Sequence, residues 1–153
     1  FTRAADWARE YAGELVKDIT ETTRGRIRSV VGNWIESTDH TLPDLWKQLQ
    51  EDHAFSRARA KLIATTEATR AYTEGQLEAG REAERQSVFE YEKQWETISD
   101  DARCQICAAL QYNGNNAVIG IDTPFDSMVG PLQGSPAHPG CRCWIVTVPR
   151  WQT

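Results

Sequence analysis

Residues 135–150 read SPAHPGCRCWIVTVPR, and the stretch passes from a turn rich in proline, glycine and cysteine into an apolar run. The apolar run holds β-branched and aromatic residues, which favour a strand. The turn before it gathers one of the chain's 3 histidines and two of its 4 cysteines. A chain that uses both residue types so sparingly and still groups them is typical of a metal-binding protein.

The other two cysteines, Cys104 and Cys107, form a C-x2-C pair in DDARCQICAAL, and the second group is His138, Cys141 and Cys143. A structural zinc ion takes four tetrahedral ligands, which two chelating pairs joined by a loop can supply. The sequence therefore predicts a zinc site. The favoured ligands are Cys104, Cys107, His138 and Cys141, whereas Cys143 either replaces the histidine or supports the ligands from behind.

Three alternatives to a metal are left open by the spacing. Two disulfides would use the same cysteines, although neighbours in a C-x-C pair bond poorly to each other. A redox-active C-x2-C pair at the head of a helix would leave the second group without a role. The third alternative is a set of buried thiols. We also expect Arg142, between two cysteines, to offset thiolate charge or to pair with a carboxylate.

The first 85 residues read as helices. Apolar side chains recur at a spacing near four over residues 3–37, which predicts one long amphipathic helix. A short helix is expected over 42–50, with proline in its first turn. A third helix is expected over 56–85. Its apolar stripe, which includes Leu62 and Tyr72, is thin, so this helix needs a partner helix.

The pattern changes after residue 85. The alternation in SVFEYEKQWETI predicts a half-buried strand with Phe89, Tyr91 and Trp95 on its inner side. A short helix is expected within SDDARCQICAAL, capped by Ser99 or Asp100.

The rest of the chain reads as a turn at YNGNN (112–116), a short strand at AVIGI (117–121), a long loop rich in glycine and proline, and the closing strand. The predicted fold class is α+β. Long N-terminal helices form a helical arm over residues 1–85. A small α+β module with a short antiparallel sheet, clipped by zinc, follows over residues 86–153.

The charge balance restricts the partners. A formal net charge of −5 argues against a dedicated nucleic-acid binder, which normally shows a basic face. Arg57, Arg59 and Lys61 lie at a spacing of two, which distributes them around a helix and indicates a solvated surface. No apolar run approaches the ~20 residues that span a bilayer, so no membrane partner is expected.

Few residues suggest catalysis. His40 and His53 are expected at the surface, and Glu67 is expected to be an exposed helix carboxylate, although it could serve as a general base. Asp100 and Asp101 read as acids at the start of a helix. The sequence therefore predicts a protein that is not an enzyme.

Three motifs in fixed order carry a resemblance to a known family. They are RARAKLIATTEATRAYTEG, then WETISDDARCQIC from Trp95 to Cys107, then HPGCRC from His138 to Cys143. Over about residues 24–148 the chain resembles the phage Mu F-like head-morphogenesis family.

The resemblance implies a minor capsid protein of a tailed double-stranded DNA phage. Its implied partners are the portal protein and other capsid proteins, and its implied role is head assembly or genome delivery. The implied location is the virion, in the capsid interior or at the portal vertex, and the host cytoplasm during assembly. Weak contact with packaged DNA and a homo-oligomer are left open. The alternative function is a virion-delivered effector or a treble-clef-like nuclease that uses Glu67 or His138.

Overall fold

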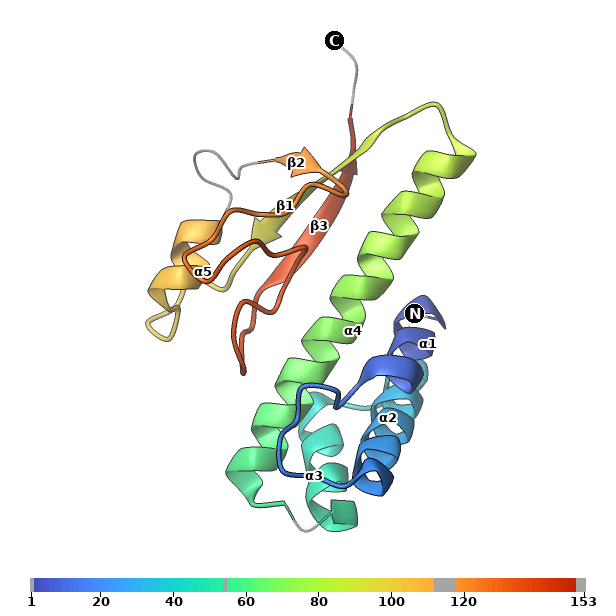
Figure 1. Ribbon diagram of the computed structural model, residues 1–153, viewed down its shortest axis with the longest axis vertical. Coiled ribbons are helices and arrows are strands. Elements are labelled where there is room, and N and C mark those ends of the chain that lie inside the picture. Colours follow the sequence, from blue (N-terminus) through green and yellow to red (C-terminus); the bar gives the residue numbers. More distant parts are fainter. Residues whose placement is uncertain (1, 54, 112–117, 151–153) are drawn as a thin grey trace.

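The computed structural model describes residues 2–53, 55–111 and 118–150, and its architecture is α+β, as predicted. Figure 1 shows the long helix α4 between the other N-terminal helices on one side and a three-stranded sheet on the other. In chain order the elements are α1 (Thr2–Tyr11), α2 (Glu21–Glu36), α3 (Leu42–His53), α4 (Arg57–Gln86), β1 (Tyr91–Glu96), α5 (Gln105–Leu110), β2 (Ile119–Gly120) and β3 (Trp144–Pro149).

The single helix expected over residues 3–37 is wrong, because the chain folds back between α1 and α2. Gly13 has a φ of +76°, in the left-handed region that ends helices. Thr20 then caps α2 by accepting a hydrogen bond from the N–H of Thr23 at 3.1 Å. The two helices are antiparallel, and Arg9 forms a two-pronged ion pair with Glu36 near the far end of α2.

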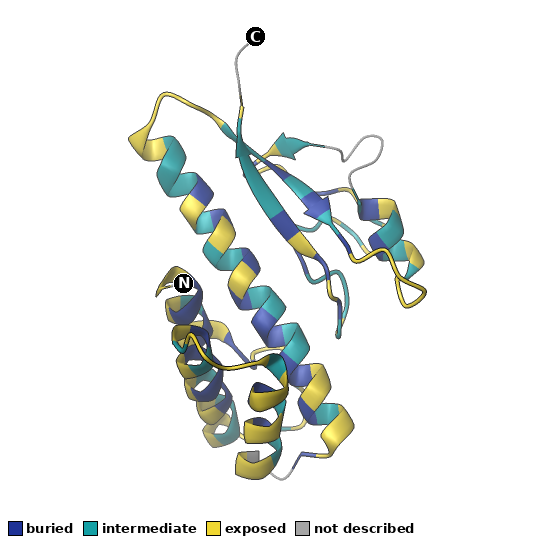
Figure 2. Cartoon of the chain, turned by 180° about the vertical axis from the view of Figure 1, so that it is seen from behind, coloured by how far each residue is buried: buried dark blue, intermediate teal, exposed yellow. Residues whose placement is uncertain are grey.

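Helices α3 and α4 confirm the two further helices that the sequence predicted. Ser56 caps α4 by accepting a hydrogen bond from the N–H of Arg59 at 3.2 Å. The expected apolar stripe is wrong at Leu62 and Tyr72, which are 45% and 40% exposed, although Leu77, at its end, is fully buried. Figure 2 shows that buried residues instead run along α4 between the helices and the sheet. In its first half these are mostly small residues, namely Ala60, Ile63, Ala64, Ala68 and Ala71.

The sheet has the order β2-β1-β3, and both pairings are antiparallel. Trp95 of β1 pairs with Ile145 of β3 and is fully buried, as the alternation predicted. The same face also buries Lys93, whose Nζ donates a hydrogen bond to the backbone oxygen of Gln133 at 2.7 Å. The inner position expected for Phe89 is wrong, since Phe89 precedes β1 and is 42% exposed. The strand expected over 117–121 is confirmed in part as β2, which is limited to Ile119–Gly120, and residue 117 and the turn expected over 112–116 lie outside the described residues.

The expected cap of the short helix is wrong. Cys104 caps α5, and its sulfur accepts a hydrogen bond from the N–H of Cys107 at 3.4 Å. Asp100 instead holds Arg142 through two hydrogen bonds of 2.8 and 2.9 Å. The expectation that Arg142 pairs with a carboxylate is therefore confirmed.

Two hydrophobic cores lie on the two sides of α4. Residues of α1 to α4 form the first core, and Leu77 of α4 joins Trp95 in the second. Because α4 contributes to both cores, the division at residue 85 stays a prediction. No helix in the described ranges has both the length and the apolar character needed to cross a membrane.

Candidate metal centre

The structure brings the two cysteine groups together. The short helix α5 presents Cys104 at its cap and Cys107 in its first turn. The loop before β3 presents the second group, and the N–H of Cys141 donates a hydrogen bond to the backbone oxygen of His138 at 3.1 Å. This turn aims the histidine and the cysteine in the same direction. All four cysteines are free thiols.

The donor atoms form two groups of three that share Cys107, and in each group the atoms lie within 4.8 Å of one another. The first group is Cys104, Cys107 and His138, and the second is Cys107, Cys141 and Cys143. His138 Nε2 lies 3.2 Å from the sulfur of Cys104 and 3.3 Å from that of Cys107. The sulfurs of Cys107 and Cys141 lie 3.7 Å apart. This cluster of thiols and an imidazole could hold a metal ion.

The orientation of His138 suits a ligand. Its Nδ1 lies 2.9 Å from the backbone oxygen of Pro139, to which it can donate a hydrogen bond. A proton held on Nδ1 leaves a lone pair on Nε2, the atom that faces the two sulfurs. This is the usual arrangement of a histidine that binds a metal.

The four thiols differ in acidity. Burial opposes ionisation of Cys104, but hydrogen bonds from Cys107 and the nearby His138 lower its pKa to about 7. Burial raises the pKa of Cys107 to about 12. The pKa of Cys141 is raised, first by its hydrogen bond with Cys143 and then by burial. A bound metal ion would hold such thiols deprotonated, because the thiolate is the form that ligates.

Cys143 is buried, as Cys107 and Cys141 are, and it has further contacts with Thr97 and Trp95. Its pKa is lowered, chiefly by the hydrogen bond from Cys141 and further by Thr97 and the indole of Trp95. The buried Nε1–H of Trp95 nevertheless finds no hydrogen bond of ordinary geometry among the described atoms. A thiolate at Cys143 could accept a hydrogen bond from this donor.

Three threonines of α4 hold the loop that carries the second cysteine group. The N–H of Gly140 donates to Thr66 Oγ1 at 2.9 Å, and Thr69 Oγ1 donates to the backbone oxygen of Cys141 at 3.3 Å. The hydroxyls of Thr73 and Ser135 lie 2.6 Å apart and are buried. The long helix therefore positions half of the candidate ligands.

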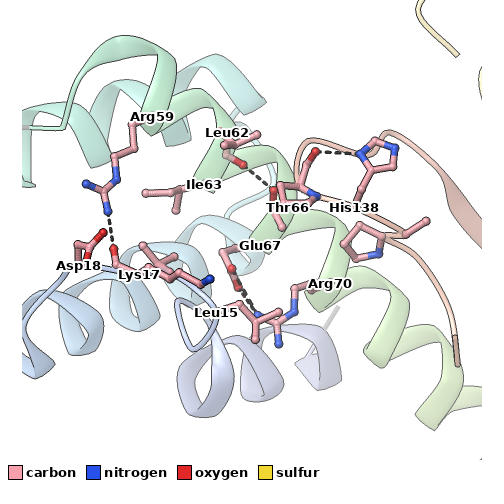
Figure 3. Close-up of a pocket in the computed structure, with 14 residues that line it drawn as sticks. Leu15, Lys17, Asp18, Arg59, Leu62, Ile63, Thr66, Glu67, Arg70 and His138 are labelled. Carbon is pink, nitrogen blue, oxygen red and sulfur yellow. Dashed lines mark hydrogen bonds and ion pairs between the residues drawn. The ribbon is translucent and has the colours of Figure 1, made fainter. Parts of the chain in front are cut away.

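A pocket of about 410 Å³ lies where the metal loop meets α4 and the bend between α1 and α2. Figure 3 shows Glu67 and Arg70 side by side in it, with His138 at one edge. The expectation that Glu67 is exposed is wrong, since it is 1% exposed and ion-paired with Arg70 at 3.0 Å. Burial raises its pKa, although Arg70 and the N–H of Gly13 oppose that rise. Glu67 of α4 thus also contacts the bend between α1 and α2, through the N–H of Gly13.

The remaining predicted residues lie apart from the cluster. His40 is exposed, as expected, and the side chain of His53 lies outside the described residues. Thr66 and Thr69 were not predicted from the sequence as contacts of the metal loop. Their spacing of three on one helix face was the signal that could have identified them as a polar contact.

A comparison with protein families found one match, to the model described as "Phage Mu protein F like protein", over residues 25–146. The matched region contains most of α2, all elements from α3 to β2, the first half of β3 and all five candidate ligands. No curated protein and no solved structure matches the chain. The family is one of phage head-morphogenesis proteins, which work with other capsid components. Because the match covers most of its length, the chain belongs to the phage Mu protein F-like family.

Proposed function

We propose that this protein is a minor capsid protein of a tailed double-stranded DNA phage. It associates with the portal and acts in head assembly or genome delivery, and its α+β module is fixed by a structural zinc ion. It resides in the virion after assembly in the host cytoplasm. The observation that carries the proposal is the Cys/His cluster that joins α5 to the loop before β3, inside the family match.

The donor set and its spacing support zinc as the ion. Zinc–sulfur bonds of about 2.3 Å in a tetrahedron separate two sulfurs by about 3.8 Å. Cys107 and Cys141 already lie 3.7 Å apart, and His138 faces the sulfurs of Cys104 and Cys107. These four residues are the proposed ligands, and Cys143 supports them from behind. Binding of structural zinc releases roughly 10 kcal/mol or more, which offsets a substantial part of the conformational entropy that the loop loses on ordering.

The environment of the two candidate catalytic residues supports assembly rather than turnover. Glu67 is ion-paired with Arg70, and Nε2 of His138 faces the thiols of Cys104 and Cys107. A general base must reach a substrate proton, whereas both groups are engaged in contacts within the protein. The role of the protein is accordingly to hold other components in place.

The outer face of the sheet supports a docking role. Trp144 pairs with Glu96 across the strands, and Val148 pairs with Glu92, so the four side chains share the face opposite Trp95. Trp144 is 46% exposed. Exposed aromatic residues beside charged ones are typical of the energetic centres of protein interfaces. We assign this face, which we call the Trp144 face, to the portal contact.

The experiment is co-purification of the full chain with the portal protein of the same phage, followed by titration of the purified pair. The double variant Trp144→Ser and Val148→Ser should weaken binding by about tenfold or more. Leu15→Ser is the control, since Leu15 is 67% exposed but lies in the bend between α1 and α2 and not on the sheet, and the affinity of this variant should be unchanged. Failure of the unmutated chain to bind the portal would refute the portal role.

A further inference from the structure

Three basic side chains from two helices converge on one aromatic ring at the end of the arm farthest from the sheet. The guanidinium of Arg57 lies 5.0 Å from the ring centroid of Trp46, and the ammonium groups of Lys61 and Lys47 lie 5.1 and 5.8 Å away. All three cations are exposed, and the ring is half-buried. We call this set the Trp46 basic cluster. Stacking on the ring restrains the side chains without neutralising them.

The cluster is not balanced by acids. Across the described ranges, none of its three cations forms an ion pair, although hydrogen bonds from Thr41 and then the charge of Lys47 lower the pKa of Asp44. Several arginines elsewhere are ion-paired, as Arg85 is with Glu78 at 2.8 Å. The chain has a net charge of −5, and yet these three cations gather on one ring without an ion-paired acid.

The position of the cluster on α4 adds to its positive potential. Arg57 is the first residue of this 30-residue helix, and the first turn contains no acid. The N-terminus of a helix carries partial positive charge, so helices usually place acids there and bases at the other end. Basic residues at this end cost stability. Where a sequence departs from this preference for acids at the start of a helix, the departure points to a functional site.

We infer that the Trp46 basic cluster binds the phosphate backbone of duplex DNA, without sequence preference. Three restrained cations and a helix N-terminus form a compact anion-binding surface, and phosphates repeat along a duplex at the density such a surface needs. The acids of the rest of the molecule repel DNA, which leaves the end of the arm as the point of contact. The inference extends the proposed function by adding packaged DNA as a partner.

The test is fluorescence anisotropy of the full chain with a labelled duplex of about 20 base pairs at several salt concentrations. If three phosphates are neutralised, affinity should fall about 40-fold between 50 and 200 mM salt. The triple variant Lys47→Gln, Arg57→Gln and Lys61→Gln should lose about tenfold or more in affinity, and most of the salt dependence should disappear. The charge-conserving variant Lys47→Arg, Arg57→Lys and Lys61→Arg should retain binding.

The matched control is the triple variant Arg81→Gln, Arg85→Gln and Arg150→Gln, which removes the same charge from cations that are ion-paired. Its affinity for DNA should stay within about twofold of the unmutated chain. Equal losses in the two triple variants would overturn the inference. So would competition by polyglutamate as effective as that by DNA, because it would indicate an acidic protein as the partner. Portal binding and metal content are separate measurements, so failure here leaves the proposed function standing.

Discussion

Thr73 shows how one buried side chain can tie the metal loop to the long helix. Its hydroxyl and that of Ser135 lie 2.6 Å apart, and both residues are almost fully buried. A buried hydroxyl that loses its partner keeps the cost of leaving water and gains nothing in return. Removing one hydroxyl of the pair should therefore cost more stability than the hydrogen bond itself contributes.

We predict that Thr73→Val lowers the free energy of unfolding by about 1–3 kcal/mol, because the Ser135 hydroxyl is left buried without a partner. The double variant Thr73→Val and Ser135→Ala removes both polar groups and should recover most of the loss. Urea unfolding of the four proteins in the cycle measures both effects. A double variant that is as unstable as the sum of the two single variants would contradict this account.

At the same scale, the sequence could not reveal Glu67 and Lys93 as buried. Charged residues are normally exposed. In the folded chain Glu67 forms an ion pair with Arg70, and Lys93 donates hydrogen bonds to the two oxygens of Gln133. Cys104, Cys107 and His138 were predictable as a group, because chelating pairs have a recognisable spacing. The choice between Cys141 and Cys143 depends on how the loop turns, which spacing alone does not determine.

Among the elements, α4 depends on its small residues to pack against neighbours on both sides. A Cβ added at Gly75 would meet the Cβ and the backbone nitrogen of Ala4 at 2.8 and 3.0 Å. The same addition at Gly25 of α2 would meet nothing within 4 Å. Gly75 is therefore required for the close packing of α4 against α1, whereas Gly25 only lowers the stability of α2.

We predict that Gly75→Ala destabilises the protein by about 1 kcal/mol or more, because α1 must move away from α4. Gly25→Ala should instead stabilise it by roughly 0.5–1 kcal/mol, the usual gain when alanine replaces glycine in a helix. Chemical denaturation of both variants provides the comparison, and each serves as the control of the other. A stabilising Gly75→Ala would show that α1 does not pack on α4 as described.

The elements themselves were partly predictable. The N-cap at Ser56 and the alternation around Trp95 are local signals, so α4 and β1 were found. The fold-back after α1 was missed, because apolar spacing continues through it and does not reveal the left-handed conformations of Gly13 and Asp18. Lys47 lies on a different helix from Arg57 and Lys61, so their convergence on Trp46 was also beyond local reasoning.

On the scale of the whole molecule, α4 joins regions with different tasks. A 30-residue helix is about 45 Å long, and this one carries the basic cluster at its start and the sheet along its second half. The metal loop docks between them through Thr66 and Thr69. A metal ion that fixes this loop would also fix the Trp144 face relative to the arm. The central claim is therefore the metal itself.

Elemental analysis of the purified full chain tests that claim most directly, with Cys104→Ser, Cys141→Ser and Cys143→Ser measured beside it. The account predicts about one zinc ion per chain in the unmutated protein, a large loss in the first two variants, and retention in Cys143→Ser. Less than about a third of an equivalent in the unmutated protein would contradict a structural zinc site, since such sites are normally filled.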